Sequence, residues 1–345
     1  MADTVFVDQS NATPVVAAWL NDINNLRYGA SSVSRGAALL QFIQTGSDAT
    51  VRTAQNKMRE IKSVADFGAV GDGVTDDTAA IQAAIASLGA AAGGVVFFPI
   101  GTYLCDALTI STDGITFAGE SRSGSILQYS GTTGNFLAAG GSINYFRLHD
   151  IQLKGVNHTS GWGINFSGNA SWAMRDIIFD NFIVTGFYNG VKTGETINSR
   201  MSLGRVAKTQ TAGIGVQIGE TSPDEQPTTT VLSQIYISGF NTADLYNKYC
   251  YGLILDEVVL ETSAVGLQTA TGTFTVGSVH QESVTNSVYA EGPVHLVMAN
   301  LPSSWGTITY LNDTVKQQSR ISNNAQTFTR ASRSSVQTIT GGAGF

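Results

Sequence analysis

Apolar residues recur in short blocks along the middle of the chain, and each block can be written over six positions. The first position is Leu, Met or Val, the third is polar, and the fourth is Ile or Val. The blocks begin at Leu148, Met174, Leu232, Leu255 and Val276, at steps of 26, 58, 23 and 21 residues. The longest step has room for one further block, which we place at residues 203–208. Such repeats, with no helical pattern between them, predict a β-solenoid in which each coil adds one strand spacing, roughly 4.8 Å.

Strand alternation within the blocks predicts which side chains face inward. The first and fourth positions should point into the solenoid, whereas the fifth position and the residue directly after the block should face outward. The fifth position holds Gln152, Ile178, Tyr236, Val259 and His280, and the position after the block holds Lys154, Asp180, Ser238, Glu261 and Glu282. We therefore expect Glu261 and Glu282 to be neighbours on consecutive coils, with Cβ atoms about 5 Å apart.

The polar third position directly precedes the strand, where turns favour short polar side chains. Asp150 and Asp176 occupy this position, and at a spacing of one coil they could be taken for a catalytic pair of carboxylates. We interpret both as turn residues instead.

A different pattern lies between Val64 and Tyr103. Three glycines fall in the turn-like sequence DFGAVGDG, where tight turns need a positive φ. Asp76 and Asp77 then stand where a helix N-cap prefers a short acceptor, and Ile81, Ile85 and Leu88 follow on one helical face. The acidic residues of this stretch, Asp72 included, are interpreted as turn and cap residues rather than as a calcium site.

The motifs DFGA, GDG, DDT and GVVFFP followed by GTY carry a resemblance to a known family. They resemble the capping element that opens the right-handed parallel β-helix of the pectate-lyase-like superfamily. The resemblance implies an all-β chain: a single-stranded right-handed parallel β-helix with a capping helix. Roughly eight to ten coils would fit between Val95 and Tyr310.

The apolar spacing in residues 1–61 predicts short helices, the first beginning at Pro14. This segment has too few apolar residues to form a core that is stable alone. The stretches TPVVAAWLNDINNLRYG and FIQTGSDATVRTAQNKMREIK resemble the N-terminal parts of tail-spike and tail-fibre proteins of tailed bacteriophages. The alternative is a secreted bacterial β-helix protein with a helical leader. The tail-spike resemblance implies a virion anchor and neck at 1–61, a capping element at 62–103, a parallel β-helix at 104–311, and a polar C-terminal segment at 312–345. Either this last segment wraps around a trimer axis or a separate chain completes the assembly.

Composition narrows the function classes. The formal net charge is −7, which argues against a general nucleic-acid binder because phosphates require a basic face. Only 13% of the residues are charged, and the two cysteines, Cys105 and Cys250, form neither a disulfide framework nor a metal motif. With no apolar run of 18 residues and no signal-peptide pattern, we expect no membrane insertion, and the sequence calls for no cofactor or metal.

Glu261 and Glu282 are the candidate catalytic residues. Glycoside hydrolysis uses two carboxyl groups, one protonated as general acid and the other acting as base or nucleophile. Tyr236 and His280 flank the pair and are candidate substrate-binding residues. The resemblance implies a tail spike located in the virion after assembly in the host cytoplasm. It further implies a homotrimer that attaches to tail or baseplate proteins through residues 1–61 and depolymerises a bacterial surface polysaccharide such as capsule or O-antigen.

Two alternatives stay open. A polysaccharide lyase abstracts a proton next to a uronate carboxylate and needs a base and a neutralising cation, roles that Lys192 and Glu195 could fill. Arg200 and Tyr188 are further candidates for substrate binding in this stretch. The other alternative is a receptor-binding or structural tail protein that uses the same scaffold without catalysis.

Overall fold

The structure is a computed structural model, and the chain divides into two compact units, Met1–Ile61 and Lys62–Phe345. The described residues are 40–89, 93–167, 174–211, 213–220, 227–270, 272–292, 294–298, 307–310, 320–323, 326–328 and 336–338. The first helix expected in the anchor lies outside the described residues. In the first unit, β1 (Gln41–Phe42) pairs antiparallel with β2 (Arg52–Thr53), and helix α3 (Ala54–Met58) follows directly. Thr53 caps α3 by accepting a hydrogen bond from the backbone N–H of Asn56 at 3.1 Å.

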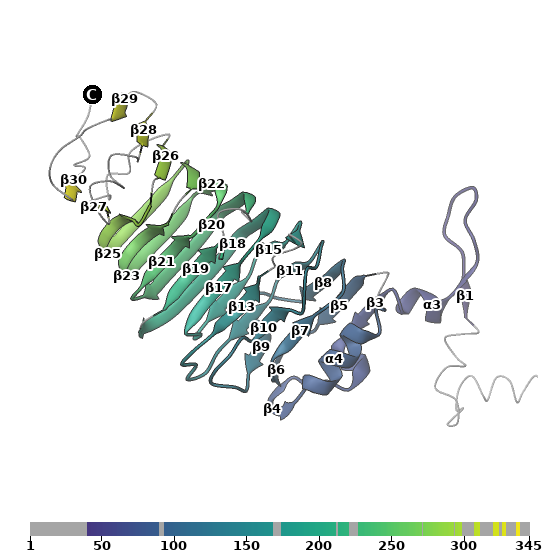
Figure 1. Ribbon diagram of the computed structural model, residues 1–345. Coiled ribbons are helices and arrows are strands. Elements are labelled where there is room, and N and C mark those ends of the chain that lie inside the picture. Colours follow the sequence, from purple (N-terminus) through teal and green to yellow (C-terminus); the bar gives the residue numbers. More distant parts are fainter. Residues whose placement is uncertain are drawn as a thin grey trace, which may run out of the picture. The chain divides into compact units, whose positions relative to one another are not determined.

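The second unit opens with the capping element expected from the glycines and aspartates. Strand β3 (Ile61–Ser63) leads into a 3₁₀ turn, η1 (Val64–Phe67), then strand β4 (Asp72–Asp76) and helix α4 (Thr78–Ala86). The three turn glycines have φ values of 95°, 68° and 77°, as the pattern predicts. Helix α4 buries Ile81 and Ile85 at the first coil (Figure 1).

The acidic residues of this element are occupied by turn and cap hydrogen bonds. Asp76 Oδ1 accepts from the Thr78 backbone N–H at 2.9 Å, and Asp72 Oδ1 accepts from the backbone of Val74 at 2.8 Å. Asp77 is the exception, because its buried carboxylate turns back to the backbone N–H groups of residues 70 and 71 instead of capping α4. Among the described residues, no group of three or more His, Cys, Asp or Glu is placed to hold a metal ion.

Beyond the capping element, short strands stack in parallel as a β-helix of about eight turns (Figure 1). Each turn contributes to three stacks, which we call faces A, B and C. Face A contains β5 (Gly94–Phe98), β8 (Ile115–Gly119), β11 (Arg147–His149), β15 (Ile178–Asp180), β22 (Tyr251–Asp256), β24 (Gly272–Val276), β26 (Val294–Met298) and β28 (Arg320–Asn323). Face B contains β6 (Gly101–Cys105), β9 (Ser125–Tyr129), β12 (Gln152–Lys154) and β16 (Ile183–Thr185). Face C contains β7 (Leu108–Ile110), β10 (Leu137–Ala139), β13 (Trp162–Phe166), β17 (Asn189–Thr193), β19 (Ile214–Ile218), β21 (Ala243–Asn247) and β27 (Thr307–Tyr310).

Four long strands run around a corner and contribute to two faces each. Strands β18 (Thr196–Thr211) and β20 (Thr228–Phe240) join faces A and B, whereas β23 (Val258–Thr269) and β25 (Val279–Ala290) join faces B and C. The short strand β14 (Met174–Arg175) pairs with the start of β18. Two further strands, β29 (Gln326–Phe328) and β30 (Val336–Thr338), pair antiparallel with β28 and β27.

The core is built from the inward positions of the three faces. Along face A, Phe117, Leu148 and Phe179 pair coil by coil, and all three are fully buried. Aromatic rings continue from coil to coil, with centroids 5.1 Å apart for Phe98 and Phe117 and 5.6 Å apart for Phe117 and Phe146. Each coil thus buries apolar area against the next, which is the stabilising contact of a solenoid.

Two of the six-residue blocks are in the wrong register. Phe179, not Met174, pairs with Leu148, so the block at 174–179 begins five residues too early. Met201 pairs in turn with Phe179, so the block placed at 203–208 begins two residues too late. The first error has a physical cause: Asp176, like Asp150, forms a left-handed turn before an isoleucine, but at a different corner of the coil.

The interpretation of the third position as a turn is confirmed. Asp150 has a φ of 57° and Asp176 a φ of 55°, and Gln234 and Glu257 at the same position are also left-handed, with φ values of 56° and 53°. Cys105 and Cys250 are free and buried. No helix in the described part of the chain is long and apolar enough to span a membrane.

Candidate functional site

The acidic pair lies on the outer surface of face B, on consecutive coils. Ser238 pairs with Glu261, and Glu261 pairs with Glu282, while the preceding residue Leu260 is fully buried, so the two glutamates face outward. The expected juxtaposition of Glu261 and Glu282 is therefore confirmed, and their catalytic role stays a prediction.

The two glutamates have different surroundings. The Tyr236 hydroxyl donates a hydrogen bond to Glu261 Oε2, and this bond raises the pKa of the tyrosine. Glu282 is more exposed, with 66% of its side chain accessible, and its Oε2 lies 3.8 Å from His280 Nε2. The pair thus combines one carboxylate held by a hydroxyl with one that is open to solvent.

Tyr236 also contacts a neighbouring cation, the guanidinium group of Arg205. Arg205 is its register partner on the preceding coil, and the guanidinium carbon lies 5.5 Å from the centre of the tyrosine ring. A cation over an aromatic ring is attracted by the ring's negative face. Arginine, tyrosine and glutamate therefore follow one another along face B, over the coils that contain Arg205, Tyr236 and Glu261.

A buried aspartate, which the sequence patterns did not reveal, lies close to this pair. Asp244 on β21 is fully buried, and neither carboxylate oxygen makes a hydrogen bond of standard geometry with a described residue. The Ser263 hydroxyl and the backbone of Phe240 and Glu261 nevertheless lie close enough to offset part of the effect of burial on its pKa. The nearby Ser263 hydroxyl donates to the backbone oxygen of Val265 at 3.0 Å. Burial raises the pKa of Asp244 to about 8, and the charge of Glu261 adds to the shift.

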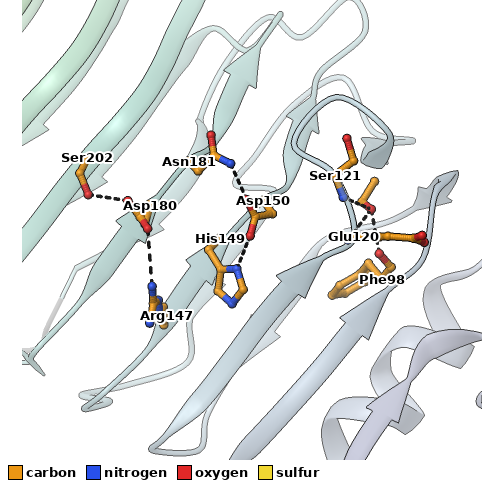
Figure 2. A network of polar contacts seen from close by, with 10 residues as sticks. Phe98, Glu120, Ser121, Arg147, His149, Asp150, Asp180, Asn181 and Ser202 are labelled. Carbon is orange, nitrogen blue, oxygen red and sulfur yellow. Dashed lines mark hydrogen bonds and ion pairs between the residues drawn. The ribbon is translucent and has the colours of Figure 1, made fainter.

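A network of charged and polar side chains crosses face A and the corner toward face B (Figure 2). Arg147 Nη2 lies 3.5 Å from Asp180 Oδ2, and Asp180 Oδ1 accepts a hydrogen bond from Ser202 on the following coil at 2.7 Å. His149 Nδ1 and Asp150 Oδ2 are 2.7 Å apart, and Asn181 donates to the other oxygen of Asp150.

Both carboxylates of this network connect successive coils. Partial burial tends to raise the pKa of Asp150, but the hydrogen bonds from His149 and Asn181 outweigh it and hold the pKa below its usual range. Asp180 faces outward, as expected for the position after the block, although it reaches that position on face A. These contacts explain Asp150 and Asp180 as cross-links between coils.

The residues proposed for a lyase lie on and after face C. Lys192 on β17 forms an ion pair with Glu220, and only 11% of the lysine side chain and 28% of the glutamate side chain are exposed. The Lys192 ammonium also lies 5.9 Å from the centre of the Trp162 ring. Burial tends to raise the pKa of Glu220, but the hydrogen bond from Lys192 outweighs it and lowers the pKa. Glu195 is buried in the segment between β17 and β18.

The candidate substrate-binding residues do not all lie together on the coil. Arg200 is exposed on face A, whereas Tyr188 lies just before β17, with the Lys208 ammonium 4.5 Å from its ring centre. Only Tyr236 and His280 lie beside Glu261 and Glu282 on face B. The sequence did not reveal Asp244, nor did it place Glu220 beside Lys192 or Arg205 beside Tyr236. The alternation on β18 could have indicated the position of Arg205 once its register was known.

Comparison with known proteins agrees with this architecture. Residues 61–144 match the family described as Rhamnogalacturonase A/epimerase, pectate lyase-like. The tail spike protein of Shigella phage Sf6 is 29% identical over 162 residues, which are 44% of this chain and 26% of that protein. Mannuronan C5-epimerase AlgE4 of Azotobacter vinelandii is 32% identical over 164 residues, 44% of this chain and 27% of the epimerase.

The matches to these curated relatives span only about a quarter of each relative's length. Among solved structures, the gp42 tailspike of Acinetobacter phage vb_AbaP_AS12 superposes with a TM-score of 0.55 at 12% identity. That superposition covers 73% of this chain and 45% of the tailspike. The chain therefore carries a pectate-lyase-like parallel β-helix and is a homologue of phage tail spike proteins.

Proposed function

We propose that the protein is a phage tail component that binds a bacterial surface polysaccharide and cleaves it by hydrolysis, with Glu261 and Glu282 as the catalytic carboxyl groups. The observation that carries the proposal is their placement: two carboxylates in register on adjacent coils, facing outward on a solenoid homologous to tail spikes. Like charges placed side by side on a surface repel each other, so their presence calls for a role or a compensating contact. Tyr236 and His280 supply polar contacts around the pair.

The two environments suggest separate roles. The Tyr236 hydroxyl donates a hydrogen bond that fixes the position of the Glu261 carboxylate, so Glu261 acts as the base or nucleophile. Glu282 is more exposed to an incoming glycan, so it takes the role of general acid. Adjacent parallel strands are roughly 4.8 Å apart, closer to the roughly 5 Å between the carboxyls of retaining enzymes than to the 6.5–9.5 Å of inverting ones. We therefore expect hydrolysis with retention of the anomeric configuration.

Hydrolysis on face B has better support than β-elimination at Lys192. A base for elimination must have a free lone pair, whereas the Lys192 ammonium is held in a largely buried ion pair with Glu220. Elimination would require that ion pair to open. Attachment to the tail through residues 1–61 and assembly as a homotrimer in the virion belong to the same proposal and rest on the tail spike homology.

The test is incubation of the purified protein with a panel of capsules and O-antigens. Hydrolysis predicts new reducing ends without an ultraviolet absorbance change, and an anomeric product that initially keeps the configuration of the substrate. Reducing ends accompanied by the absorbance of unsaturated uronates would establish the lyase alternative instead. Binding to a glycan without cleavage would establish the non-catalytic, receptor-binding alternative and overturn the catalytic roles.

A further inference from the structure

Positive charge is concentrated in the middle coils of this negatively charged chain. Residues 62–121 contain one Lys or Arg and seven Asp or Glu. Residues 209–291 likewise contain one Lys or Arg but nine Asp or Glu. Residues 122–208 reverse this balance, with eight Lys or Arg and four Asp or Glu. Because the coils stack in chain order, these residues form a positive belt between two negative ends of the β-helix.

Three guanidinium groups of the belt lie around one backbone corner, which we call the arginine corner: Arg122, Arg200 and Arg205. Arg200 and Arg205 stand on β18 on either side of the left-handed residue Leu203, and the next residue after each is buried, so both point outward. Arg122 comes from the loop between β8 and β9, and its Nη1 donates to the Leu203 carbonyl oxygen at 3.2 Å. Residues from distant parts of the sequence thus gather at one exposed corner.

Within the described residues, none of the three arginines of the arginine corner has an Asp or Glu oxygen within 4.0 Å, whereas Arg147 on face A is paired with Asp180. Three like charges at one corner are unfavourable unless an anion binds among them. The planar fork of donors on arginine matches carboxylate and phosphate oxygens, and stacking on Tyr236 holds Arg205 in place.

The corner lies beside the proposed catalytic pair. Arg205 pairs with Tyr236, and Tyr236 pairs with Val259, so Arg205 and the strand of Glu261 are two strand spacings apart, roughly 10 Å. Tyr236 contacts both the arginine corner and the acidic pair, since its ring stacks with Arg205 and its hydroxyl donates a hydrogen bond to Glu261. A polymer anchored at Arg205 and running along the coils would therefore pass over Glu261.

We propose that the arginine corner binds an anionic group of the glycan, so that the substrate is an acidic polysaccharide whose carboxylate or phosphate groups are held by Arg200 and Arg205. This inference rests on the proposed function and specifies its substrate class. Negative charge on the remaining coils would repel such a polymer elsewhere, which restricts its approach to the positive belt.

The test compares binding of three defined oligomers to the full chain by calorimetry at fixed ionic strength: hexamannuronate, poly(glycerol phosphate) and neutral maltohexaose. We expect at least one acidic oligomer to bind on the order of tenfold or more tightly than maltohexaose. The double variant Arg200→Gln, Arg205→Gln should lose that preference. The matched variant Arg52→Gln, Arg59→Gln removes the same net charge from the first unit and should keep it.

The two acidic oligomers distinguish carboxylate from phosphate as the bound anion. Equal affinity for acidic and neutral oligomers, or an acidic preference that survives in Arg200→Gln, Arg205→Gln, would overturn the inference. Both substitutions are at exposed positions, and an unchanged melting temperature of the double variant shows that it is folded. The binding test can fail while the proposed hydrolysis stands. If the protein cleaves a neutral surface glycan and the cleavage requires Glu261, hydrolysis is upheld and an acidic substrate is excluded.

Discussion

The buried carboxyl of Asp244 predicts that stability falls as pH rises through the neutral range. The residue is fully buried, and its register neighbours on the preceding and following coils are Gly215 and Gly266. A carboxyl in a position that two adjacent coils fill with glycine has no solvent to stabilise its charge, and the polar contacts from Ser263 and the backbone offset its burial only in part. The folded protein therefore holds Asp244 protonated, with a pKa of about 8.

The magnitude follows from the difference between the folded pKa and the ordinary value. The pKa rises from 3.8 to about 8, and each unit corresponds to about 1.4 kcal/mol. Between these values the folded state binds one proton more than the unfolded state, so the free energy of unfolding falls with rising pH. The stability associated with Asp244 is fully present below pH 3.8 and is lost as pH rises through about 8. From pH 5 to pH 8 the loss is about 4 kcal/mol.

The assay is chemical denaturation of the wild type and of Asp244→Asn and Asp244→Gly at pH 5, 6, 7 and 8. Glu261, the charged group that faces Asp244, is present in all three proteins, so the difference between wild type and variants isolates Asp244. We expect the wild type to lose stability relative to both variants by about 1.4 kcal/mol per pH unit. Stability curves that stay parallel across this range would show that Asp244 does not retain its proton on folding, which contradicts this prediction.

Three further predictions concern the scaffold. His158 Nδ1 accepts a hydrogen bond from the Tyr188 backbone, Nε2 faces the Gly134 carbonyl oxygen, and burial lowers the pKa of the imidazole. The stability that His158 contributes is therefore lost as pH falls below about 6.5. The melting temperature should drop between about pH 7.5 and 5 in the wild type and less so in His158→Leu. Gly215→Ala should lower the unfolding free energy by about 1–3 kcal/mol, because the new Cβ would lie 2.3 Å from a buried isoleucine methyl, whereas Gly141→Ala, with open space around it, should change little. Asp77→Ala leaves two backbone N–H groups without acceptors and should cost about 3 kcal/mol in denaturant unfolding; a change below about 1 kcal/mol would contradict the role given to this carboxylate.

Much of the fold was predictable because a solenoid repeats its physical requirements. Every coil needs buried apolar positions and tight corners, and both leave a visible pattern, as at Leu148 and Asp150. The register at Met174 was not predictable from that pattern, because Asp150 and Asp176 are both left-handed and both precede an isoleucine, yet they lie at different corners of successive coils. The sequence does not show which corner such a turn occupies; only the pairing with the neighbouring coil does.

The candidate site was predictable where it depends on strand alternation and not where it depends on contacts across coils. The adjacency of Glu261 and Glu282 followed from the repeat alone. The partner of Lys192 did not, because Glu220 is 28 residues away and reaches the lysine only after the coil closes. Asp244 stayed unnoticed because polar residues are expected on the surface, and only the three-dimensional register places this one against the core.

The catalytic role of Glu261 and Glu282 is tested by the initial rate at which reducing ends appear from a cleaved surface glycan. Wild type should be compared with Glu261→Gln and Glu282→Gln, and with Glu257→Gln as a control, an exposed glutamate at a left-handed corner of the same coil as Glu261. Each substitution of the pair should reduce the rate on the order of 10²-fold or more, since both carboxyl groups take part in proton transfer or bond formation. The control should keep the wild-type rate. Full activity in both Glu261→Gln and Glu282→Gln would contradict the assignment of the site.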